Sequence, residues 1–100
     1  MTIATVVHHL KSLRFNMKLG IYEHYKKKRY EVIGVARDSD TLEEFVVYRA
    51  LYDSEEFGDH ALWVKLKPAF LEDVEIDGVR MPRFRFVGKN KDIEIRAIAV

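Results

Sequence analysis

A basic run enclosed by aromatic residues has the side-chain types most suited to binding chemistry in this sequence. Lys26-Lys27-Lys28-Arg29 lies between Tyr25 and Tyr30. A positively charged turn beside aromatic rings can hold phosphate groups and stack nucleobases. A lysine-rich turn can also simply keep the edge of a sheet soluble. The run taken alone leaves both interpretations open, and the second is the plainer one.

A lone tryptophan marks a second candidate binding patch. In a strand over residues 61–67, side chains alternate between faces, so the aliphatic residues lie opposite Trp63. On a closed sheet, an outward Trp63 would mark a binding surface. If another segment covers that face, Trp63 belongs to a second, minor core, and both possibilities remain open. The basic residues expected beside it are Lys65, Lys67, Arg83 and Arg85.

The histidines do not predict a metal or catalytic site. Of His8, His9, His24 and His60, only the adjacent first pair is closely spaced, and helix neighbours point in different directions. His24 could act as a general base, but no nucleophile motif or glycine-rich phosphate loop accompanies it. We therefore predict no catalytic residue, no metal and no cofactor.

Arg49 is the clearest polar anomaly within an apolar stretch. It lies in the middle of a predicted strand, and if buried it must be paired with a carboxylate. Glu31, Glu43 and Glu44 are the candidate partners. Such a pair could be purely structural, or it could line a ligand cleft together with the nearby polar and aromatic residues. These residues are Tyr22, His24, Tyr25, Arg37, Tyr48, Tyr52 and Trp63.

Composition limits the class of protein. The chain has 100 residues, 48% hydrophobic and 33% charged, which is typical of one folded globular domain. A net charge of +1 implies no overall attraction to nucleic acid or membranes. Cysteine is absent, which excludes disulfides and thiolate chemistry and favours the reducing cytoplasm. Neither a membrane-spanning apolar run nor a signal peptide is recognisable.

The first 18 residues differ from the rest of the chain. Val6, Leu10, Leu13 and Met17 share one face of a predicted helix. Alternatively, Met17 is the natural start and the preceding residues are upstream sequence read in frame. We treat residues 1–18 as an extension and residues 19–100 as one domain.

From residue 19 onward the pattern predicts short β-strands, dense in β-branched and aromatic residues. Asp77-Gly78 suits a type I′ hairpin turn, which places Glu75 opposite Arg80. Residues 67–72, with Pro68, predict one helical turn. The expected strands cover residues 20–25, 29–36, 44–52, 61–67, 74–76 with 79–87, and 92–99.

These strands predict a mainly β fold, an antiparallel, SH3-like, partly open barrel of about five to six strands. The strand at residues 44–52 is apolar on both sides except at Arg49, which indicates an interior position. The last strand, residues 92–99, could pair with a second copy and form a homodimer.

Three stretches of the sequence resemble a known family. They are GIYEHYKKKRYEVIGVARDSDTLEEFVVYRALY, LWVKLKPAFLE and VEIDGVRMPRFRFVG, and in this order they resemble the bacterial domain-of-unknown-function family 1653. The resemblance covers Gly20 to about Gly88, and it supports Met17 as the natural start. Lys27 stands where glycine is expected, and Asp38 where histidine is common. The resemblance implies a small bacterial β-rich protein and names no substrate.

These observations favour a small, non-catalytic binding module for a peptide or a nucleic acid, with no membrane role. The alternative is a small-molecule sensor or enzyme with a shallow cleft, which requires His24 and Arg49 to lie within hydrogen-bond reach. The predicted ligand-binding residues are Tyr22, His24, Tyr25, Arg49, Trp63, Lys65 and Arg83.

Overall fold

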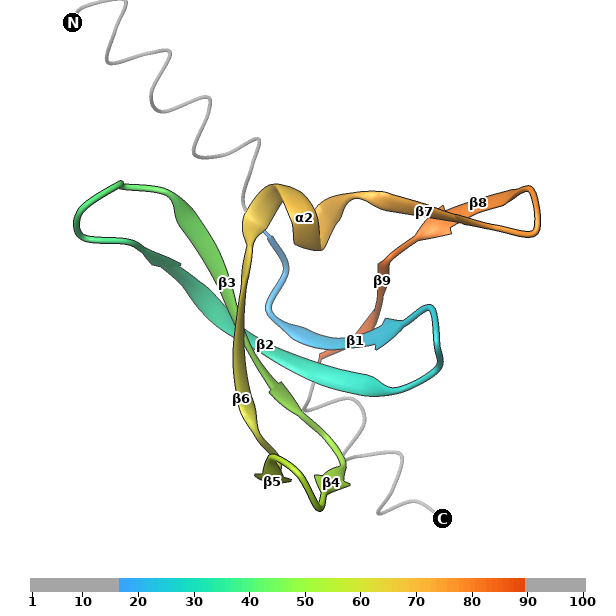
Figure 1. Cartoon of the computed structure of the whole chain (residues 1–100), viewed down its shortest axis with the longest axis horizontal. Coiled ribbons are helices and arrows are strands. Elements are labelled where there is room, and N and C mark those ends of the chain that lie inside the picture. The colour runs from blue at the N-terminus through green and yellow to red at the C-terminus, as the bar shows by residue number, and fades with distance from the viewer. Residues whose placement is uncertain (1–16, 90–100) are drawn as a thin grey trace, which may run out of the picture.

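The computed structural model describes residues 17–89, which form antiparallel strands and one short helix (Figure 1). Every predicted strand within this range is present, and the fold is mainly β as expected. The elements are β1 (Gly20–His24), β2 (Arg29–Arg37), β3 (Glu44–Ala50), β4 (Asp53–Ser54), β5 (Gly58–Asp59), β6 (Leu62–Leu66), α2 (Lys67–Leu71), β7 (Asp73–Ile76), β8 (Val79–Pro82) and β9 (Phe84–Gly88).

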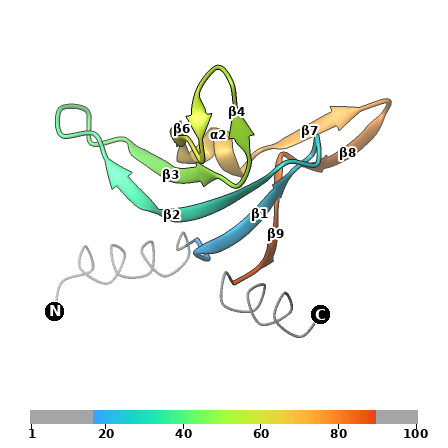
Figure 2. The same ribbon diagram turned by 90° about the horizontal axis from the view of Figure 1, so that it is seen from below.

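Five strands form the main antiparallel sheet, in the order β6-β3-β2-β1-β9. β3 lies inside this sheet, which confirms the interior position expected for residues 44–52. Among the described strands, β6 and β9 are the edges and do not pair with each other. The sheet is therefore not closed into a barrel, and Figure 2 shows it as an open, curved layer.

Two small hairpins extend the sheet. β4 pairs with β5 beyond the ends of β3 and β6, and the β7–β8 hairpin projects to one side (Figure 1). At the tip of the second hairpin, Asp77 and Gly78 have φ angles of 52° and 78°, as a type I′ turn requires. Glu75 lies opposite Arg80 in this hairpin. The predicted turn and its register are confirmed.

The core lies on the face of the sheet that α2 covers, which we call the inner face. Cross-strand pairing determines which side chains meet on this face. Tyr22 lies opposite Tyr30, and Val32 lies opposite Tyr48. α2 begins with Pro68 in its first turn, as the sequence predicted, and inserts Phe70 into this core. The buried core cluster contains Tyr22, Val32, Val46, Tyr48, Phe70 and Phe84.

The two faces of β6 are occupied in the opposite way to that expected. Leu62 and Val64 remain 64% and 62% exposed, whereas Trp63 packs against the core cluster. The expectation that the aliphatic side of this strand would face the core is wrong. Pairing with β3 explains this orientation. Trp63 lies directly opposite Tyr48, whose side chain points to the inner face, so Trp63 points to the same face.

Two predictions fall outside the described residues. The helix expected in residues 1–18 lies almost entirely before Met17, and the strand expected at residues 92–99 lies after Lys89. Both therefore stay predictions, as do the domain limits. Within the described range, no helix is long and apolar enough to cross a membrane.

Candidate ligand-binding surface

His24, at the end of β1, lies where aromatic and basic side chains meet. Its ring stacks at a tilt on Tyr25, with centroids 4.4 Å apart, and meets Phe84 edge-on at 4.9 Å. The backbone N–H of Lys26 donates to His24 Nδ1 at 3.1 Å, which leaves Nε2 to carry the proton of the neutral ring. The tight turn after β1 thus fixes both the orientation and the tautomer of this histidine.

The environment of His24 is positively charged. Burial lowers the pKa of His24, and the charges of Lys26, Arg83 and Lys65 lower that pKa further. Lys65 comes from β6, at the opposite edge of the sheet from β9. Lys65 and His24 share the inner face, because Lys65 lies opposite Val46 and His24 lies opposite Phe84.

The predicted basic run forms the turn between β1 and β2. Lys27 has a φ of 83°, a left-handed conformation in which glycine is less strained, and this is where the family resemblance leads us to expect glycine. Lys28 Nζ lies 4.2 Å from the ring centroid of Tyr52, a cation–π contact. The Tyr52 hydroxyl in turn lies 2.5 Å from that of Tyr30. Within the basic run, Lys28 therefore contacts an aromatic residue of the inner face.

Trp63 and Lys65 form the opposite side of this region. Both are half-buried and lie two residues apart on β6, on the inner face. Phe57, from the loop between β4 and β5, meets Trp63 edge-on with ring centroids 4.9 Å apart. Lys65 makes no ion pair with any residue in the range 17–89.

Arg83 lies between β8 and β9, where it joins three segments. Its N–H donates to the Glu72 carbonyl at 3.1 Å, and its carbonyl accepts from the Tyr25 N–H at 3.0 Å. Its guanidinium pairs with Glu72 Oε1 at 2.6 Å. Arg85, which the sequence placed beside it, instead pairs with Glu23 on the outer face of the sheet. Only Arg83 belongs to the region around His24.

We call this region the aromatic-basic surface. It unites five of the seven predicted ligand-binding residues with Lys26 and Lys28 of the turn. It also contains Tyr30 and Tyr52, which the sequence analysis named but did not place among the ligand-binding residues. The position of Tyr30 directly after the basic run is the sequence signal that links it to this surface. The surface consists of His24, Tyr25, Lys26, Lys28, Tyr30, Tyr52, Trp63, Lys65 and Arg83.

Two predicted site residues lie elsewhere. Tyr22 is buried in the core, where burial raises the pKa of its hydroxyl, and it donates a hydrogen bond to the Lys18 carbonyl at 2.7 Å. Arg49 points to the outer face, and its Nε lies 3.4 Å from Glu31 Oε1, one of the partners that the sequence suggested. Arg49 and Glu31 help to line an open hollow of about 820 Å³ on that face.

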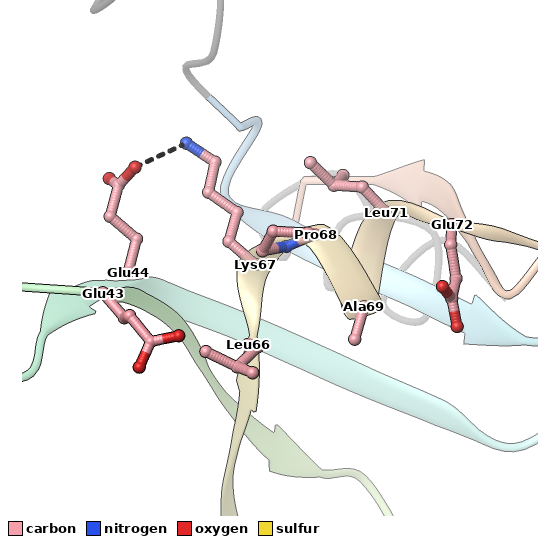
Figure 3. Close-up of a pocket in the computed structure, with 8 residues that line it drawn as sticks. All are labelled: Glu43, Glu44, Leu66, Lys67, Pro68, Ala69, Leu71 and Glu72. Atoms are coloured by element: carbon pink, nitrogen blue, oxygen red, sulfur yellow. Dashed lines mark ion pairs between the residues drawn. The ribbon is translucent and has the colours of Figure 1, made fainter. Parts of the chain in front are cut away.

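A further hollow of about 690 Å³ lies beside α2 (Figure 3). Lys67, expected with Lys65 on a binding patch, is instead 8% exposed and forms an ion pair with Glu44 at 3.7 Å. Its incorporation into α2 interrupts the strand alternation that grouped the two lysines. In residues 17–89, no group of three or more histidine, cysteine, aspartate or glutamate side chains is arranged to hold a metal ion.

The comparisons with known proteins cover the whole aromatic-basic surface. Residues 20–86 match the family described as "Protein of unknown function (DUF1653)". A crystal structure of a protein of that family from Bordetella bronchiseptica is 32% identical, with a TM-score of 0.66. The similarity covers 74% of this chain and 91% of that one. No curated protein matches the chain. The chain therefore belongs to the DUF1653 family.

Proposed function

We propose that this chain is a non-catalytic binding module whose aromatic-basic surface holds single-stranded nucleic acid. The observation that carries the proposal is the convergence of cations on half-buried rings. Lys28 Nζ lies 4.2 Å from the ring centroid of Tyr52, and Lys26 Nζ lies 5.8 Å from that of Tyr25. Lys65 and Trp63 lie on the inner face of β6. A surface of this kind suits a ligand with repeated negative charges and flat apolar groups.

Single-stranded nucleic acid supplies both parts of that ligand. Its phosphates attract lysine side chains, and its bases stack on exposed aromatic faces without strict sequence preference. Lys26, Lys28 and Lys65 form no ion pair with the described residues, so their charges are available to phosphates. The ring of Trp63 is half-buried and lies two residues from Lys65 on the same face. A peptide is the other class of ligand considered, and the test below separates the two.

The alternative of an enzyme or small-molecule sensor lacks the required geometry. It needs His24 and Arg49 to share a cleft, but His24 shares the inner face with Phe84, its partner across β1 and β9. Arg49 lies opposite Glu31 on the outer face. We also propose a cytoplasmic location, which the absence of cysteine supports.

The test is fluorescence anisotropy of labelled single-stranded oligonucleotides at low and moderate salt. Binding should weaken as salt rises, with a slope of about 0.7 for each neutralised phosphate. Lys65→Gln should weaken binding by about three- to tenfold, as the loss of one charge contact implies. Arg80→Gln is the matched control, because Arg80 lies on the projecting β7–β8 hairpin.

The single tryptophan gives an independent signal for the same titration. Stacking on or near Trp63 should quench its emission, and the quenching should follow the anisotropy. Binding of an anionic peptide with no binding of oligonucleotides would assign the surface to peptides and overturn the nucleic-acid proposal. Equal binding by the Lys65→Gln and Arg80→Gln variants would show that this surface is not the site.

A further inference from the structure

The edge strand β6 exposes a row of apolar side chains. Leu62 and Val64 are 64% and 62% exposed, and Leu66 is 38% exposed. All three lie on the outer face, because they alternate with Trp63 on the inner face. Among the described strands, β6 pairs with β3 alone, and it runs from the β4–β5 hairpin to α2 (Figure 1). An apolar strand at the edge of a sheet is typical of a site where a further strand is added.

The backbone of β6 points its remaining hydrogen-bonding groups outward at these same residues. The Ala50 N–H donates to the Ala61 carbonyl at 2.9 Å, in the register that pairs β3 with β6. In an antiparallel ladder, alternate residues turn both backbone groups toward the same neighbour. Residues 63 and 65, like Ala61, therefore bond to β3. The residues whose N–H and C=O groups point away from β3 are Leu62, Val64 and Leu66.

These outward groups allow β6 to pair with itself. Hydrogen bonds form between two copies where outward-pointing residues meet, and a twofold axis at Val64 meets this condition. Val64 then lies opposite Val64 of the second copy, and Leu62 lies opposite Leu66 of the second copy. Every outward N–H and C=O group of the strand gains a partner, and the apolar row becomes continuous across both copies.

The same axis makes the inner face complementary. Trp63 lies opposite Lys65 of the second copy, in a pair without hydrogen bonds, where side chains approach closely. Lys65 makes no ion pair within residues 17–89, and an ammonium group over an indole ring is favourable. An axis at Lys65 would instead oppose two ammonium groups, and an axis at Trp63 would place Leu66 opposite the turn residue His60. The side chains of β6 therefore favour the axis at Val64.

The opposite edge of the sheet lacks these features. Phe84 of β9 is buried in the core, and Arg85 on the outer face pairs with Glu23 of the same sheet. The described chain ends at Lys89, directly after β9 and on the far edge of the sheet from β6. Of the two edges of the main sheet, β6 is therefore the one that suits a second copy.

We propose that two copies of this chain associate through β6, antiparallel about Val64, and form one continuous sheet. Five residues from each strand take part, compared with about 20–30 on each side of a standard interface, so we expect a reversible dimer. The cation–π pair leaves Lys65 charged, and the aromatic-basic surfaces of the two copies meet where the strands pair. The inference stands apart from the proposed function, because its tests contain no nucleic acid.

Sedimentation velocity over about a hundredfold range of protein concentration tests the association. The unchanged chain should shift from monomer to dimer as its concentration rises. Val64→Lys should raise the dissociation constant about tenfold or more, because two ammonium groups then lie opposite each other. Val79→Lys is the matched control, since Val79 is 57% exposed on the projecting β7–β8 hairpin. A monomer at every concentration, or equal constants for the two variants, would overturn the proposal.

The absence of cysteine allows the axis to be located by disulfide formation. Val64→Cys places one sulfur on each side of the axis, where opposite Cα atoms about 5.5 Å apart permit a disulfide. This variant should form linked dimers about tenfold faster than Val79→Cys in a glutathione buffer. Lys65→Cys is the control for register, because its cysteines lie opposite each other only about an axis at residue 65.

Each result of the cysteine comparison has a definite meaning. If Val64→Cys links no faster than Val79→Cys, any dimer forms through another surface and the proposal fails. If Lys65→Cys links as fast as Val64→Cys, the register about Val64 is wrong. Circular dichroism checks that every variant is folded, and if Val64→Lys is not, sedimentation of the unchanged chain and the cysteine comparison together decide the matter.

Discussion

The ring of Phe70 lies flat on the ring of Phe84, with centroids 4.0 Å apart and planes 4° from parallel. Phe70 belongs to α2 and Phe84 to the edge strand β9, so this contact ties the helix to one edge of the sheet. The Tyr48 ring from β3 meets both phenyl rings edge-on. Three segments far apart in the sequence therefore share one aromatic cluster, and α2 is the element that closes it.

Removal of the Phe70 ring should destabilise the domain strongly. Phe70→Ala is expected to lower the free energy of unfolding by about 3–5 kcal/mol, because it leaves a cavity among packed rings. Leu62→Ala is the control, since Leu62 is largely exposed and its truncation should cost well under about 1 kcal/mol. Urea denaturation followed by Trp63 fluorescence measures both. Similar losses for the two variants would contradict the placement of the core.

Gly20 should tolerate no side chain. Its φ is +137°, and a Cβ there would lie 2.7 Å from the Gly88 carbonyl oxygen of the neighbouring strand. Gly20→Ala should therefore destabilise the domain by about 1–3 kcal/mol.

Gly34 provides the matched control for this substitution. No atom lies within 4 Å of the position of its Cβ, and its φ is not left-handed. Gly34→Ala should be neutral or slightly stabilising, by up to about 1 kcal/mol, because it restricts the unfolded chain. Thermal unfolding of both variants decides the matter, and a Gly20→Ala variant as stable as Gly34→Ala would contradict the close approach of β1 and β9.

The paired hydroxyls of Tyr30 and Tyr52 should titrate abnormally. Burial raises the pKa of Tyr30, and the hydrogen bond with Tyr52 raises that pKa further. Tyr52→Phe should lower the pKa of Tyr30 toward its usual value and cost about 1 kcal/mol of stability. Alkaline titration by the ultraviolet absorbance of tyrosinate measures the pKa. Tyr25→Phe is the control, and an unchanged titration of Tyr30 in Tyr52→Phe would rule out the hydroxyl pair.

Acidification should weaken the fold through His24. Because the folded state lowers the pKa of His24 from the usual 6.5, the unfolded chain takes up this proton at a higher pH than the folded chain does. Stability should therefore be constant well above pH 6.5 and decline as the pH falls through 6.5 toward the lower pKa of the folded protein. Thermal unfolding between neutral and mildly acidic pH measures this effect.

His24→Gln should remove this part of the pH dependence, because glutamine carries no titratable proton. Leu62→Ala is the control, because it truncates an exposed side chain that carries no titratable proton. Equal slopes for the two variants over the acidic range would show that His24 is not held neutral by burial and by its cationic neighbours.

Local sequence was enough to place the strands of the main sheet, the β7–β8 hairpin and α2, but not the two-residue strands β4 and β5. β-Branched and aromatic runs between turn residues located the strands, Asp77-Gly78 located a hairpin tip, and Pro68 located the helical turn. Each of these signals acts over a few residues, so it survives without knowledge of the rest of the chain. The partner of Arg49 was also among the predicted candidates. Glu31 lies directly opposite Arg49 across the adjacent strands β2 and β3.

The candidate site depended on contacts that sequence patterns do not encode. Alternation separated Trp63 from Leu62 and Val64 correctly, but the alternation pattern cannot say which side is buried. Pairing with β3 determines which side of β6 is buried, because Trp63 lies opposite Tyr48 and Tyr48 belongs to the buried core cluster. In the same way, only strand pairing placed Lys65 of β6 on the inner face that His24 of β1 also occupies. The sequence by itself determined where strands form, since that depends on neighbours along the chain, while the tertiary structure decided which faces meet, since that depends on partners across the sheet.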